Sequence, residues 1–128
     1  MKQPVSQFKD KRGIARLTSA FWNTMDGFKS AWHGEQAFRQ EVVAGAVGTV
    51  IALLLPISAF QKLALIGVLL FVVIIELINS AIEAVVDRIS LERHPLSKDA
   101  KDFGSAAVGL SIVLAAAIWA VVLFNRFY

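Results

Sequence analysis

Three long apolar stretches dominate the pattern of this chain, and polar residues lie between them. They cover residues 42–55, 63–86 and 106–124. Crossing the hydrocarbon core of a bilayer takes about 20 residues of α-helix, so the first stretch must begin earlier than its apolar run. We therefore predict three transmembrane helices, at about 38–55, 63–86 and 105–124.

A fourth helix is predicted before the first apolar stretch, because large apolar residues recur there at helical spacing. On a helical wheel they fall within about 80° of one another, and polar residues take the other side. Such a helix, over about 15–34, is expected to lie in the membrane interface. It is either a simple anchor or a wall of an active site. The apolar row consists of Leu17, Phe21, Met25, Phe28 and Trp32.

Composition supports a membrane protein rather than a soluble one. Hydrophobic residues make up 56% of the 128 residues, and the mean hydropathy is +0.61. We predict an all-α integral membrane protein, with residues 1–128 forming a single membrane domain. The chain has no cysteine, which excludes disulfides and thiolate metal sites. Its basic residues form no patch interleaved with aromatics, so nucleic acid is not an expected partner.

The distribution of Lys and Arg predicts the orientation in the membrane. Cytoplasmic segments are enriched in these residues. They are frequent before the first span and again in a polar link over 88–103, whereas the link over 56–62 holds only Lys62 and the C-terminal end only Arg126. The N-terminus and the second link should therefore be cytoplasmic. The N-terminal set is Lys2, Lys9, Lys11, Arg12, Arg16, Lys29 and Arg39.

Polar residues also form a row inside the second apolar stretch. Glu76, Ser80, Glu83 and Asp87 fall within about 60° on a helical wheel, and Asn79 lies beside them. Ionisable groups inside a span are costly unless they face protein, water or a cation. The row must therefore line a site or an interface.

Three interpretations of this row follow from the residues alone. It joins helices together, it relays protons or ions in a small transporter, or it coordinates a cation for phosphate chemistry. Lys98 and Lys101 in the second link favour a nucleotide, since lysines bind phosphates. Neither a P-loop nor a kinase glycine loop is present, so any ATP site is built differently. His33 and His94 each stand alone, and we assign neither as a metal ligand.

The segment Glu76-Leu-Ile-Asn79-Ser-Ala-Ile-Glu83-Ala-Val-Val-Asp87-Arg resembles the signature of the prokaryotic diacylglycerol kinase family. Residues 31–41 upstream and 101–107 downstream resemble the family too, in its order and approximate spacing. The resemblance covers most of the chain from Lys29 to Val108. It departs at Asn23 and Asp26, where family members tend to carry an aromatic and a basic residue.

The resemblance implies an ATP-dependent kinase of the bacterial inner membrane that converts diacylglycerol to phosphatidic acid. It also implies Mg²⁺ as cofactor, ATP as cosubstrate and a homotrimeric bundle. Related proteins phosphorylate undecaprenol instead, and spacing alone does not separate the two lipids. An ion-coupled transporter is the alternative from another class.

The resemblance further implies a division of labour among the site residues. Glu76 is implied as the catalytic base, and Glu35 and Glu83 as the metal ligands. The implied nucleotide contacts are Arg16, Asn23, Glu35, Asn79, Glu83, Glu92, Arg93, His94, Lys101 and Asp102. The implied lipid-substrate contacts are Arg16, Lys29, Trp32, Phe38, Arg39, Gln40, Glu41, Glu76 and Ser105.

Overall fold

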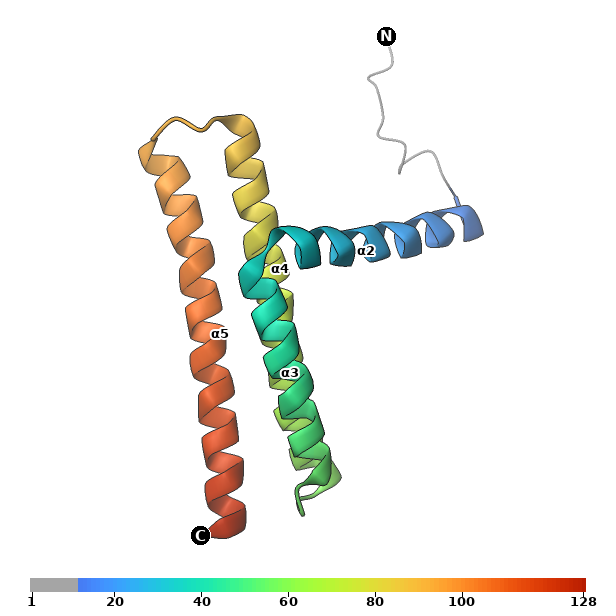
Figure 1. Ribbon diagram of the computed structural model, residues 1–128, viewed down its shortest axis with the longest axis vertical. Helices are drawn as coiled ribbons and strands as arrows, with labels where there is room; N and C mark the ends of the chain where they lie inside the picture. The colour runs from blue at the N-terminus through green and yellow to red at the C-terminus, as the bar shows by residue number, and fades with distance from the viewer. Residues whose placement is uncertain (1–11) are drawn as a thin grey trace. The chain divides into compact units, whose positions relative to one another are not determined.

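The computed structural model describes residues 12–128, and every regular element in that range is an α-helix (Figure 1). The range divides into two compact units between Gly34 and Glu35, and each is described by itself. The all-α prediction is confirmed. The cations Lys2, Lys9 and Lys11 of the orientation argument lie outside the described residues. The helices are α2 (Ile14–Gly34), α3 (Gln36–Leu54), α4 (Ala59–Ile89) and α5 (Pro95–Phe127).

The first unit contains α2, which begins directly after Gly13. Gly13 has φ +62°, a left-handed conformation that glycine adopts without steric cost. Along the helix the predicted apolar row is largely exposed: Leu17 retains 71% of its accessible surface and Phe21 58%. An exposed apolar row on a single helix suits the boundary between headgroups and acyl chains.

The second unit is built from α3, α4 and α5, which are the three described helices long and apolar enough to span a membrane. This confirms the prediction of three spans. Successive helices run in opposite directions, and α4 lies against both α3 and α5 (Figure 1). Large apolar residues such as Leu53, Leu70 and Leu110 stay exposed on the outer faces, as expected of helices that meet lipid.

A stripe of buried residues on α4 holds these three helices together. Leu65, Val68 and Val72 recur every three or four residues, so they share one face. Leu65 packs with Ala52 of α3 and Val122 of α5. The indole N–H of Trp119 donates to the Leu65 carbonyl at 3.3 Å, which satisfies its polar group inside the bundle.

The link between α3 and α4 is held by polar contacts at the end of the bundle away from the acidic row. Ser58 caps α4: its hydroxyl accepts from the Gln61 N–H, and the Gln61 side chain accepts from the Ser58 N–H. This reciprocal pair satisfies two helix-terminal donors. The side chains of Lys62 and Arg126 donate to the carbonyls of Leu53 and Pro56.

The link between α4 and α5 is much shorter than the polar stretch suggested. The sequence predicted a link over 88–103, but only residues 90–94 lie outside helices. His94 begins α5 as its N-cap, with its ring nitrogen Nδ1 accepting from the Leu96 N–H at 3.1 Å, and Pro95 occupies the first turn. The 33 residues of α5 measure about 50 Å, which exceeds the hydrocarbon core, so polar residues continue the helix beyond it.

Candidate active site

The acidic row of α4 continues the buried apolar stripe of the same helix. Glu76 retains 5% of its accessible surface and Asn79 retains 7%. Glu83 is half-buried, and the Asp87 side chain retains 49%. The row therefore faces the other helices at Glu76 and is exposed at Asp87.

Carboxyl groups from two helices converge on Glu76. Its side chain interacts with Glu83, which lies about two turns further along the same face of α4. It also interacts with Glu35 and Glu41 at the start of α3. Glu35 is the N-cap residue of α3, yet its carboxylate makes no capping hydrogen bond. Like charges gathered in a poorly hydrated place repel one another, so this arrangement favours a bound cation or shared protons.

Several polar atoms at this convergence are buried without a hydrogen-bond partner in the protein. They are Glu41 Oε2, Asn79 Oδ1 and Ser80 Oγ. The amide Nδ2 of Asn79 donates to Glu83 Oε1 at 3.4 Å. Buried polar atoms are nearly always hydrogen-bonded, so atoms that lack a protein partner mark a place where a ligand or water is expected.

The carboxylates fit one kind of metal site and not another. In the described residues, 12–128, no group of three or more His, Cys, Asp or Glu side chains could hold a metal ion. A metal held entirely by protein is therefore not supported. Mg²⁺ in nucleotide enzymes usually takes only one or two carboxylates together with phosphate oxygens and water. The predicted ligands Glu35 and Glu83 are two carboxylates, and both interact electrostatically with Glu76.

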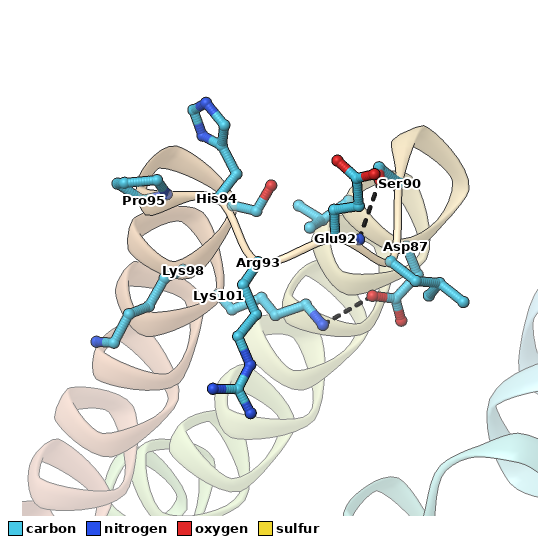
Figure 2. A pocket seen from close by; sticks show the side chains of 11 residues that line it. Asp87, Ser90, Glu92, Arg93, His94, Pro95, Lys98 and Lys101 are labelled. Carbon is cyan, nitrogen blue, oxygen red and sulfur yellow. Dashed lines mark hydrogen bonds and ion pairs between the residues drawn. The ribbon is translucent and has the colours of Figure 1, made fainter.

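A pocket of about 670 Å³ lies where α4 and α5 are joined (Figure 2). Its walls come from the last turn of α4, the short link and the first two turns of α5. Basic and acidic side chains are mixed in it, among them Asp87, Glu92, Arg93, His94 and Lys101. Its volume lies in the range that small-molecule ligands occupy.

Lys101 crosses this pocket from α5 to α4. Its ammonium group pairs with Asp87 at 2.7 Å, and both side chains are about half exposed (Figure 2). Lys98, by contrast, pairs with Asp102 on its own helix at 2.5 Å. Both ion pairs are exposed to water, which weakens them, so neither holds its lysine firmly.

The structure brings together only part of the predicted site. Glu35, Glu41, Glu76, Asn79 and Glu83 converge, while Glu92, Arg93, His94 and Lys101 line the pocket at the link. Phe38 is 4% exposed, and Gln40 and Ser105 are exposed. The predicted roles of all these residues, of Arg39 and of Asp102 stay predictions. So do those of the α2 residues, which belong to the other unit: Arg16, Asn23, Lys29 and Trp32.

Three features of the site and of the residues around it were not predicted from the sequence. The approach of Glu41 to Glu76 joins two helices and has no local signal. His94 as a helix cap was also missed, although a residue directly before Pro95 is a candidate for that position. The third is the packing of Gly104 against Asn79, which depends on how α4 and α5 meet.

Comparison with known proteins places this sequence in a family. The family of prokaryotic diacylglycerol kinases matches over residues 22–123. The diacylglycerol kinase of Pseudomonas aeruginosa is 47% identical over 120 residues, which is 94% of this chain and 98% of the relative. That of Escherichia coli K12 is 45% identical over 115 residues, 90% of this chain and 94% of the relative. That of Haemophilus influenzae is 37% identical over 112 residues, 88% and 95% of the two chains.

Proposed function

Because the chain belongs to the prokaryotic diacylglycerol kinase family, we propose that it transfers the γ-phosphoryl group of ATP to the hydroxyl of diacylglycerol, forming phosphatidic acid and ADP. The observation that carries this proposal is the acidic row. It runs from the buried Glu76 to the exposed Asp87 and ends at the pocket of the α4–α5 link. A lipid hydroxyl and a water-soluble nucleotide can meet along such a row.

Glu76 is the proposed base. Its carboxylate takes the proton of the lipid hydroxyl while that oxygen bonds to the γ-phosphorus. The bond from that phosphorus to the β,γ-bridging oxygen breaks, and ADP leaves with its electrons. A positioned carboxylate is a common general base, and Glu76 is the buried end of the acidic row, with 5% of its surface exposed.

Glu35 and Glu83 are the proposed ligands of Mg²⁺. These two carboxylates would hold the ion, which would supply positive charge to neutralise the nucleotide phosphates. The Asn79 amide donates to Glu83 at 3.4 Å, and such a partner would help to orient a ligating carboxylate. The two ligands come from α3 and α4, so the packing of these helices sets their separation.

The pocket at the link is the proposed nucleotide site. Lys101 leaves Asp87 and pairs with a phosphate oxygen, because a phosphate group carries more negative charge than the half-exposed carboxylate. Arg93 and His94 line the same pocket and supply further hydrogen-bond donors. Asp102 and Glu92 are proposed contacts of the same nucleotide.

The proposed setting is the bacterial inner membrane, with the N-terminus and the α4–α5 link in the cytoplasm, where ATP is found. The positive-inside distribution of Lys and Arg supports this orientation. The exposed apolar row of α2 supports a position in the interface, where Trp32 and Lys29 would meet the lipid headgroup. The homotrimer implied by the resemblance is part of the same proposal.

Purified protein in mixed micelles with Mg²⁺, ATP and diacylglycerol tests the activity. We expect phosphatidic acid to form in proportion to the ADP released. A parallel reaction with undecaprenol tests the lipid. Formation of undecaprenyl phosphate without phosphatidic acid would contradict the proposed substrate, and no lipid phosphate from either would contradict the kinase function.

A further inference from the structure

Gly104 lies at the point where α5 meets Asn79 of α4, and both residues are buried. A methyl group built on the α-carbon of Gly104 would collide with Asn79 Oδ1 and lie 3.2 Å from Asn79 Cγ. Of the other glycines in the described chain, only Gly48 has neighbours within 4 Å of such a methyl group. Its nearest is the flexible end of Leu69. The Asn79 carboxamide therefore occupies the space that a side chain at position 104 would fill.

The hydrogen bonds of the Asn79 amide do not fix its orientation. Its Nδ2 donates to Glu83 Oε1 at 3.4 Å, which is longer than the usual distance of such bonds, about 2.7–3.2 Å. Its Oδ1 is buried and has no hydrogen-bond partner in the protein. A single long hydrogen bond does not fix an amide, so the surface against which it packs decides where it points.

We propose that Gly104 is a positioning residue for the metal ligand Glu83, acting through Asn79. By leaving space on α5, Gly104 lets the Asn79 amide face Glu83 and hold its carboxylate. This inference rests on the proposed role of Glu83. Partners that orient a ligating carboxylate typically change metal affinity by about 10- to 100-fold when they are lost.

The direct test is Mn²⁺ binding without turnover. Mn²⁺ replaces Mg²⁺ and is followed by electron paramagnetic resonance, with the non-hydrolysable nucleotide adenylyl-imidodiphosphate and the purified full chain in micelles. Gly104→Ala should raise the Mn²⁺ concentration at half-saturation by about 10-fold. Gly109→Ala is the matched control: it lies on the same helix, and a methyl group there meets nothing within 4 Å. It should bind like the wild type.

A second pair of variants separates positioning from general packing. In Asn79→Ala the colliding atoms are gone, and the remaining Cβ would lie 3.8 Å from an added methyl at position 104, an ordinary contact. Adding Gly104→Ala to Asn79→Ala should therefore change Mn²⁺ affinity less than 2-fold further. Independent effects would instead multiply in the double variant.

The outcomes distinguish this inference from the proposed function. Weakened binding in Gly104→Ala that disappears in the Asn79→Ala background supports the positioning role. Wild-type affinity in Gly104→Ala, a multiplied loss in the double variant, or loss of the fold by Gly104→Ala alone would each overturn it. Absence of nucleotide-dependent Mn²⁺ binding in the wild type would overturn the metal role of Glu83 itself, and this inference with it.

Discussion

At the scale of single residues, the two lysines at the start of α5 show how position separates similar side chains. Lys98 and Lys101 lie about one turn apart, and both line the pocket at the link. Lys98 is paired within its own helix, with Asp102, whereas Lys101 reaches across to Asp87 and also interacts with Glu83. Lys101 is therefore the one directed toward the acidic row.

Replacing these lysines one at a time should affect nucleotide binding unequally. Lys101→Ala should raise the KM for ATP by about 10-fold or more, because it removes a charge-assisted hydrogen bond to phosphate. Lys98→Ala should change it less than about 3-fold, because Lys98 pairs with Asp102 on its own helix and is not directed toward the acidic row. Initial rates of phosphatidic acid formation at varied ATP measure both. Equal losses in the two variants would contradict the assignment of Lys101.

Ionisable and polar residues inside a predicted span were the easiest site residues to identify from the sequence, because burying them in a membrane costs free energy. The polar row stands out because charges are rare in spans, and the burial of Glu76 and Asn79 agrees with the predicted face. Glu41 and Gly104 were beyond prediction in their contacts with the row. Glu41 approaches Glu76 from another helix, and Gly104 matters for the side chain it lacks, so neither leaves a pattern along the chain.

At the scale of elements, the pattern of apolar residues predicted that the helices exist, but it did not predict where they end. The three spans were read from apolar runs, and these runs end where the hydrocarbon ends rather than where the helix ends. α5 begins about three turns before the apolar run, which shortens the link to residues 90–94. The longer α5 brings Lys101 opposite Asp87 of α4, beside the pocket proposed as the nucleotide site.

The start of α4 offers a prediction about helix capping. Ser58→Ala removes the hydroxyl that accepts from the Gln61 N–H and should lower the free energy of unfolding by about 1 kcal/mol. Ser30→Ala, at an exposed position inside α2, is the control and should change it by less than about 0.5 kcal/mol. Unfolding in SDS-containing mixed micelles measures both. The kinase rate should stay unchanged in each, and a lost rate in folded Ser58→Ala would show that this end of α4 serves the site.

At the scale of the whole molecule, the outer surface and the charge distribution agree on a membrane setting. Large apolar side chains cover the exposed faces of α3, α4 and α5, where water would penalise them and lipid would not. The acidic row lies at one end of α4, and the capped link to α3 lies at the other. The proposed orientation puts the first end in the cytoplasm.

Two exposed positions at opposite ends of α4 test this orientation. Phe60 and Leu91 each retain 86% of their accessible surface, and the chain has no native cysteine. In spheroplasts, Phe60→Cys should react with a membrane-impermeant maleimide from outside, because it lies at the predicted external link. Leu91→Cys should react only after lysis. The reverse pattern would invert the topology, and equal labelling in intact spheroplasts would contradict a membrane-spanning α4.

The measurement that tests the central claim most directly compares turnover with nucleotide binding in Glu76→Gln. Glutamine keeps the size of the side chain but cannot take the proton of the lipid hydroxyl, so phosphatidic acid formation should fall by about 100-fold or more. Binding of Mn²⁺ with adenylyl-imidodiphosphate should stay within about 3-fold of the wild type, because Glu35 and Glu83 are unchanged. Wild-type turnover in folded Glu76→Gln would contradict the account: the buried end of the acidic row would then not be where the phosphoryl group is transferred.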